Sequence, residues 1–235
     1  MMLLVCLPVC AAWSADITVY TEYYGRSNHR AENGEIVGET ADLVRQVLDD
    51  AALNYTIKLV PWNRAYQLAT HFDNTLIYAL LRKPDREEKF HWLVPISETE
   101  LYLYARADDD RVFDRTSLSA GQIRGVCQLG DVTCSMLSDL GMPQSMIIKV
   151  KENHAEATRV MMAGRADVFI AQHLHGYPFE DDGDGRKGQF KVVLKLEQTQ
   201  QFFLAAGMQV DPAVVRAVRS AHARLKAGDK LLWQP

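Results

Sequence analysis

The segment YTIKLVPWNRAYQLATHFDNTLIYALL, residues 55–81, decides the fold class of this chain. Residues 55–60 are rich in β-branched and aromatic side chains, which predicts a strand. Pro61 stands where a helix can begin without losing a needed donor, and residues 62–69 carry apolar side chains on one helical face. The continuous apolar run 75–81 is typical of a strand buried on both faces. This order predicts an α/β fold, with a parallel or mixed sheet covered by helices.

The same alternation continues on both sides of this segment. A β-rich stretch at 17–21 and an amphipathic helix at 40–52 precede it, and Pro212 begins the last helix. Between them, we expect strands at 101–105, 123–128, 146–150, 167–171, 190–196 and 201–206, a polar loop at 108–119, and helices at 133–140 and after Asn153, where Glu156 stands in capping-box position.

The last helix has no sheet of its own nearby in sequence, so it must pack on the first block of elements. The chain then crosses twice between two lobes, near residues 101–106 and 196–201. We therefore predict a first lobe of residues 16–103 plus 200–235 and a second lobe of residues 104–199. Two crossing strands form a hinge, and ligand sites lie in the cleft that such a hinge opens and closes.

Composition excludes one broad class of function. The chain has 235 residues, a net charge of −4 and 48% hydrophobic residues, with its basic residues scattered among acidic ones. A nucleic-acid-binding protein needs a basic stripe that follows phosphates, and this chain has none.

Met1 to Ala12 is apolar and uncharged, and Trp13, Ser14 and Ala15 follow before the first charge, Asp16. The length suits the apolar region of a signal peptide and is too short to span a bilayer. We expect cleavage near Ala15 and a periplasmic mature protein without membrane insertion; the alternative is a buried N-terminal strand.

Cleavage there would remove Cys6 and Cys10 and leave Cys127 and Cys134. An even, closely spaced pair in an exported protein predicts a disulfide, and the alternative is two buried free thiols. We expect no metal and no cofactor. His173 and His175 are a lone pair, and the acidic stretch 180–188 has Lys191 where a calcium loop requires glutamate.

Four motifs resemble, in their order and spacing, the extracellular solute-binding protein family 3. They are Gly38-Glu-Thr-Ala-Asp42-Leu43, Pro61-Trp62, Lys83-Pro-Asp-Arg86-Glu-Glu-Lys-Phe90 and Gly164-Arg-Ala-Asp167-Val-Phe-Ile170.

The resemblance spans Asp16 to about Trp233 and implies a two-lobed periplasmic binding protein type 2 fold. Each lobe is then a mixed sheet flanked by helices, and two hinge strands join the lobes. The implied function is non-enzymatic: a monomer captures a small carboxylate-bearing solute, amino-acid-like or another organic anion, for an ABC permease.

The resemblance also implies residue roles. Arg86 matches the arginine that clamps the ligand carboxylate, for which a planar guanidinium is suited. Read from the sequence alone, it could instead pair with a neighbouring carboxylate on the surface. Residues Asp131, Val132 and Thr133 match the helix N-terminus that faces the same carboxylate, although Asp131 could instead cap its own helix. Tyr23, Tyr24 and Trp62 match aromatic positions of the cleft, with ordinary core or rim positions as the alternative.

Three positions depart from the family pattern. Gln172 stands where an aspartate usually receives the ligand ammonium, and Lys83 and Leu81 replace two hydroxyl residues. Arg64 and Arg82, both near the expected cleft, would add positive charge. We therefore expect an anionic solute that lacks an ammonium group, unless Glu22 replaces the missing aspartate from the opposite lobe.

Two other classes of function stay open. Exported dehydratase-like enzymes share the implied fold, and Glu22 and His173 are the candidate acid–base residues. A ligand-sensing domain of a signalling system would bind the same solutes for a different partner.

Overall fold

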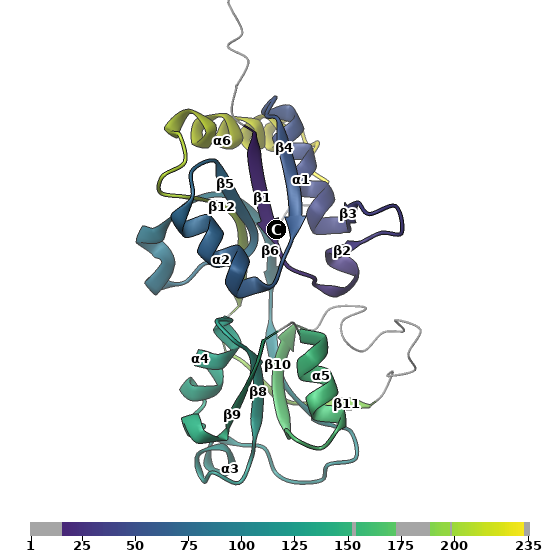
Figure 1. Cartoon of the computed structure of the whole chain (residues 1–235). Coiled ribbons are helices and arrows are strands. Elements are labelled where there is room, and N and C mark those ends of the chain that lie inside the picture. Colours follow the sequence, from purple (N-terminus) through teal and green to yellow (C-terminus); the bar gives the residue numbers. More distant parts are fainter. Residues whose placement is uncertain (1–15, 152–153, 173–188, 198, 233–235) are drawn as a thin grey trace, which may run out of the picture.

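The computed structural model describes residues 16–151, 154–172, 189–197 and 199–232, which form two lobes. Each lobe is an α/β unit built on a five-stranded mixed sheet, and Figure 1 shows the lobes one above the other, joined by extended chain. Within the described ranges, no helix is both long enough and apolar enough to cross a membrane.

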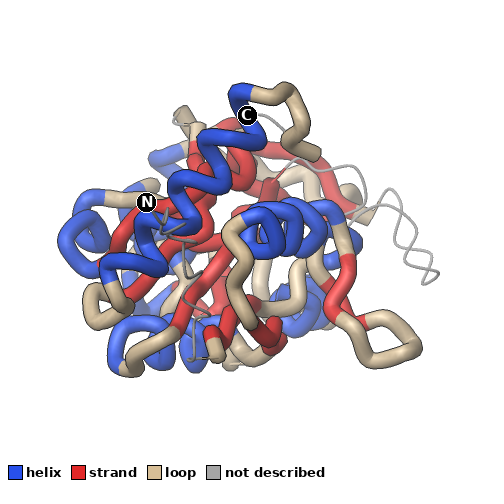
Figure 2. Tube along the Cα trace, turned by 90° about the horizontal axis from the view of Figure 1, so that it is seen from above, coloured by secondary structure: helices blue, strands red, loops and turns tan. Residues whose placement is uncertain are grey.

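The first lobe has a sheet with strand order β4-β1-β5-β12-β6, in which β1 pairs in parallel with β4 and β5. Helices α1 and α6 pack on one face of this sheet and α2 on the other (Figures 1 and 2). The bounds are β1 Ile17–Thr21, α1 Glu39–Asp50, β4 Tyr55–Leu59, α2 Trp62–His71, β5 Thr75–Leu81, β6 Phe90–Thr99, β12 Gln200–Gly207 and α6 Pro212–Ala227, with a two-stranded ribbon of β2 His29–Arg30 and β3 Ile36–Val37.

The second lobe has the strand order β11-β7-β10-β8-β9, with β8 parallel to both β10 and β9. Apolar side chains of α4 fill one face of this sheet and those of α5 the other. The bounds are β7 Leu101–Arg106, α3 Arg115–Ser119, β8 Gly125–Gln128, α4 Val132–Asp139, β9 Ile147–Val150, α5 His154–Met162, β10 Val168–Gln172 and β11 Phe190–Lys195.

Sequence periodicity locates most of these elements. Helix α1 has its buried side chains at helical spacing, and they meet α6 in the core of the first lobe. Helix α6 begins at Pro212, with the carboxylate of Asp211 accepting a hydrogen bond from the amide of Ala213 at 2.8 Å. The packing of this helix on the first lobe is what the sequence required.

The first crossing lies at Glu100, between β6 in the first sheet and β7 in the second. All of β7 pairs with β10 and β11, so residues 101–103 belong to the second lobe, and the lobe boundary falls three residues before the expected one. An alternating apolar strand looks the same in either lobe, so the pattern did not locate this boundary. The return crossing runs between β11 and β12, near the expected position.

The ten-residue strand β6 was not predicted from the sequence. Its Pro95 lacks the amide proton that a central strand would need, but β6 is an edge strand with one partner, β12, so the proline is tolerated. The expected polar loop at 108–119 also needs correction, because it contains α3, which Asp114 and Ser117 begin with a capping box.

Several expectations lie outside the described residues: the signal peptide at 1–15, the cap at Asn153, His173, His175 and the acidic stretch 180–188.

Candidate functional site

A cavity of about 200 Å³ lies between the two lobes. Its first-lobe wall follows the carboxyl ends of the parallel strands β1, β4 and β5, and its second-lobe wall follows those of β8 and β10. Ligands of α/β proteins bind at such strand ends because the sheet holds the attached loops rigidly there. The lining residues include Glu22, Tyr24, Thr40, Trp62, Ala79, Arg86, Asp131, Val132, Thr133, Ile170 and Gln172.

Arg86 provides a buried positive charge on this wall, with only 4% of its surface exposed. Its guanidinium lies 5.7 Å from the ring centre of Trp62 and 5.1 Å from that of Tyr66, and Nη1 donates to the carbonyl of Leu81 at 3.3 Å. No described carboxylate forms an ion pair with it, so surface pairing with a neighbour does not occur. Burial lowers the pKa of Arg86, and the charge of Asp131 acts in the opposite direction.

Glu22 provides a buried carboxyl group on the same wall, with 6% of its surface exposed. Its Oε2 accepts a hydrogen bond from Nε2 of Gln128, across the lobes, at 2.9 Å. Burial and then the charge of Asp131 raise its pKa to about 8, although the Gln128 hydrogen bond acts in the opposite direction. Among the ion pairs of the described residues, none involves Glu22.

A buried hydrogen-bond network holds Glu22 in place. Nδ2 of Asn28 donates to Oγ1 of Thr21 at 2.9 Å and to the carbonyl of Glu22, and the hydroxyl of Tyr78 donates to Oδ1 of Asn28 at 2.6 Å. This network fixes the backbone at Glu22, and the hydrogen bond from Gln128 orients its carboxyl group.

The first turn of α4 closes the cavity from the second lobe. Oδ1 of Asp131 accepts hydrogen bonds from the amide of Thr133 at 2.8 Å and from its hydroxyl at 2.5 Å, so Asp131 caps its own helix. The same residue lines the cavity and acts electrostatically on both Glu22 and Arg86. This helix start is therefore already partly neutralised as an anion site.

Three further expected residues line the cavity: Tyr24, Trp62 and Gln172. Nε1 of Trp62 is buried and has no hydrogen-bond partner among the described residues, which leaves one donor on this wall for a ligand. Gln172 is 5% exposed and ends β10, so the position that carries aspartate in the family pattern does face the cleft.

The structure does not bring Tyr23, Arg64 or Arg82 into the cavity wall. Arg64 is exposed on α2. Arg82 is exposed as well; it pairs with Glu87 and stacks on the rings of Trp92 and Phe203, each 5.4 Å away. The expected extra positive charge is therefore not on the wall, and Arg86 is the one basic residue among the lining residues that the structure describes.

Two acidic residues and one strained backbone position of the cavity wall were not predicted from the sequence. Glu39 and Glu98 line it from exposed positions, so the cavity carries more carboxyl than basic groups. Ala79, inside β5, has a φ of +58 and lies at the point where the pairing register between β5 and β12 shifts. A left-handed alanine in a strand is strained, and such strain concentrates at functional sites.

A disulfide joins Cys127, at the end of β8, to Cys134, in the first turn of α4. It is the pair expected from the sequence, and it lies beside the cavity residues of α4. Elsewhere, the described residues contain no group of three metal-binding side chains.

Neither a protein-family model nor a curated protein matches this sequence. Solved structures do match. The arginine-, lysine-, histidine-binding protein ArtJ from the thermophilic bacterium Geobacillus stearothermophilus has a TM-score of 0.78 and 15% identity, with 92% of each chain covered.

Two other solved structures are about as similar. A histidine kinase sensor domain with similarity to periplasmic binding proteins has a TM-score of 0.76 and 15% identity, with 92% of each chain covered. The ancestral amino acid-binding protein AncCDT-1, a precursor of cyclohexadienyl dehydratase, has a TM-score of 0.73 and 18% identity over 92% of this chain and 91% of that chain. The expected two-lobed periplasmic binding protein type 2 fold is thereby confirmed.

Proposed function

We propose that this protein is a member of solute-binding protein family 3 that captures a small amino-acid-like solute between its lobes. One observation carries the proposal: the cavity wall holds a buried guanidinium, Arg86, and a buried carboxyl, Glu22, neither in an ion pair with a described residue. A buried guanidinium without a counter-charge is unfavourable, and the buried carboxyl of Glu22 keeps its proton near neutral pH unless a cation reaches it, so each group is explained best by a ligand of opposite charge. The ligand then carries both a carboxylate and a cationic group.

This proposal revises the expectation of a solute without an ammonium group. Gln172 indeed supplies no charge, but Glu22 faces the cavity from the first lobe and can receive a cation instead. Glu39, Glu98 and Asp131 add to the negative potential of the wall. A purely anionic solute would be repelled by this negative potential and would have Arg86 as its one positively charged partner on the wall.

The proposed solute class is tested with ligands that differ by one charged group. L-arginine, agmatine, which lacks the carboxylate, and 5-guanidinopentanoate, which lacks the α-ammonium, are compared by calorimetry, alongside L-lysine, L-glutamine and succinate. We expect an amino acid to bind and its decarboxylated analogue to bind at least tenfold more weakly, because Arg86 loses its partner. Succinate binding as tightly as the best amino acid would contradict the proposal.

Acid catalysis is a second candidate, because a carboxyl group protonated near neutral pH is also what a general acid requires. Incubating the tightest ligand with the protein and following it by NMR separates the two. Unchanged ligand supports capture without chemistry, whereas appearance of a product supports catalysis.

We further propose that capture takes place outside the cytoplasm and serves an ABC importer, with residues 1–15 acting as the export signal. The apolar, uncharged composition of this segment and the disulfide in the second lobe support an oxidising compartment. Mass spectrometry of protein released from the periplasm is expected to find a chain that begins near Asp16; an intact Met1 would contradict export by this route. A protein that senses the solute for a signalling partner would bind the same ligand in the same cleft.

A further inference from the structure

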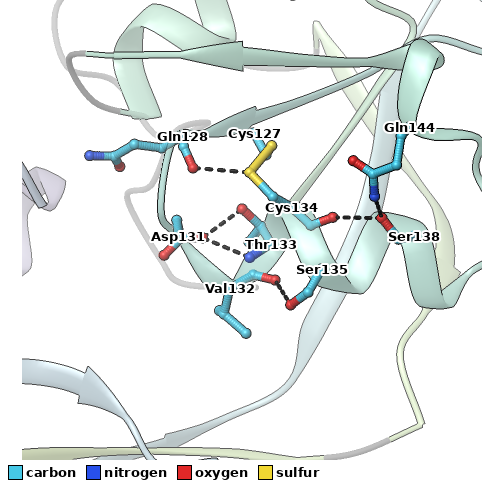
Figure 3. Close-up of a disulfide and its surroundings, with 9 residues drawn as sticks. All are labelled: Cys127, Gln128, Asp131, Val132, Thr133, Cys134, Ser135, Ser138 and Gln144. Carbon is cyan, nitrogen blue, oxygen red and sulfur yellow. Dashed lines mark hydrogen bonds between the residues drawn. A yellow bond between two sulfur atoms is a disulfide. The ribbon is translucent and has the colours of Figure 1, made fainter. Parts of the chain in front are cut away.

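The disulfide links the two ends of the loop between β8 and α4. Cys127 and Cys134 are seven residues apart, and Figure 3 shows the sulfur–sulfur bond beside the first turn of α4, with Gln128, Asp131 and Thr133 around it. Sγ of Cys134 lies 3.0 Å from the carbonyl oxygen of Gln128. This contact is not a hydrogen bond, because a disulfide sulfur carries no proton.

Three residues of this loop face the first lobe. Gln128 donates to the buried carboxyl of Glu22. Gly130 has φ +81 and packs so closely on Asn63 of α2 that a Cβ added to it would lie 3.1 Å from Oδ1 of Asn63. Asp131 acts on Glu22 and Arg86 through its charge. The residues enclosed by the disulfide therefore contact the first lobe at Glu22 and at Asn63.

The loop is anchored in its own lobe by β8, where Gln128 pairs with Val150 of β9, and by the first turn of α4, which begins at Val132. The amide of Leu129 donates to the carbonyl of Val150 at 2.7 Å, and the amide of Asp131 donates to the carbonyl of Gln128 at 3.0 Å. A disulfide that closes so short a loop restricts the unfolded chain only modestly, so its effect on global stability is limited. Its larger effect is local, on where residues 128–133 lie.

We propose that the Cys127–Cys134 disulfide is a positioning element of the cleft, which holds residues 128–133 of the second lobe against Glu22 and Asn63 of the first. Breaking the bond then releases the contact between the lobes while the second lobe stays folded. The proposal rests on the proposed function in taking this cleft as the ligand site.

The carboxyl group of Glu22 reports this contact from the opposite lobe. Its surroundings supply burial by both lobes, the hydrogen bond from Gln128 and the charge of Asp131, with Tyr24 also nearby. A disulfide with a merely structural role inside the second lobe would leave the titration of Glu22 unchanged. A positioning disulfide would change it.

The test follows the side-chain carboxyl carbon of Glu22 by NMR in ligand-free protein, assigned with Glu22→Gln. We compare the oxidised protein, the protein reduced with a phosphine, and the double variant Cys127→Ala/Cys134→Ser. The oxidised protein is expected to titrate near the raised value of about 8, and both disulfide-free forms at least one pH unit lower. Gln144→Ala is the control, since it removes the 2.5 Å hydrogen bond to Ser138 at the far end of α4 and is expected to leave the midpoint unchanged.

Each other result overturns the proposal. Equal midpoints in oxidised and disulfide-free protein would show that the bond does not position the loop. An ordinary midpoint in the oxidised protein would show that the contact is not made. Loss of helical circular dichroism on reduction would show that the disulfide supports the whole lobe. A titration of the same samples with L-arginine tests the proposed function separately.

Discussion

Replacing Arg86 with alanine is expected to weaken binding of the amino-acid ligand by about 2–5 kcal/mol, which is tens- to thousands-fold in Kd. The variant removes the basic residue of the cavity wall and leaves the ligand carboxylate without its charge partner. Arg86→Lys keeps the charge but loses the planar pair of donors, so it is expected to restore binding only in part. Calorimetry with the ligand found in the panel measures both variants.

Arg82→Ala is the matched control for this experiment. It removes an arginine four residues away that is exposed, paired with Glu87 and absent from the cavity wall. Its ligand affinity is expected to stay within about twofold, since a surface pair of this kind contributes little to its surroundings. Equal loss in Arg82→Ala and Arg86→Ala would mean that general charge, and not the buried clamp, controls binding.

Replacing Glu22 with glutamine is expected to abolish the pH dependence of binding and to stabilise the ligand-free protein. The cationic group of the ligand needs an ionised Glu22, whose pKa in the free protein is raised to about 8. Binding therefore releases a proton below pH 8, and affinity is expected to rise by up to about tenfold per pH unit between pH 6 and 8 and then level off. Glu22→Gln is expected to bind weakly and without this slope.

Whereas ligand affinity is expected to rise with pH, the stability of the ligand-free protein is expected to fall. Between the ordinary value of 4.5 and about 8, the folded state keeps the proton of Glu22 while the unfolded state has lost it, so the free energy of unfolding falls as pH rises through this window. At pH 7 the buried carboxyl then costs up to about 3 kcal/mol. Glu22→Gln is expected to recover part of that at neutral pH and little at pH 4, which thermal unfolding at the two pH values measures.

Glu39→Gln is the control, because Glu39 also lines the cavity but is exposed. It is expected to change neither the stability at pH 7 nor the slope of affinity with pH. If the slope of affinity with pH were retained in Glu22→Gln and lost in Glu39→Gln, the cationic group of the ligand would bind Glu39 and not Glu22.

The alternation of strands and helices could be predicted because it depends on local spacing. The apolar run of β5 and the helical face of α2 are properties of neighbouring residues, and the structure has both where the periodicity predicts them. The expectation that Arg86, Asp131 and Gln172 lie in the cleft came from the family resemblance, and all three residues line the cavity.

Finer assignments failed where one or two residues decide the direction of a side chain. Tyr24 lines the cavity and Tyr23 does not, and Arg86 is buried on the wall whereas Arg82 turns outward to Glu87. Both choices depend on the path of the chain after a strand ends. There the backbone is no longer regular, and periodicity carries no information about orientation.

The sequence by itself determined an α/β chain whose last helix must return to the first lobe, whereas the expectation of Arg86 in the cleft came from the family resemblance. Only the tertiary structure decided that Glu22 meets Gln128, 106 residues away and in the other lobe, and that this contact buries a carboxyl group in the cleft. The physical reason is distance along the chain. Hydrophobic spacing is set by adjacent residues, whereas burial and pKa depend on every group that the closed lobes bring together.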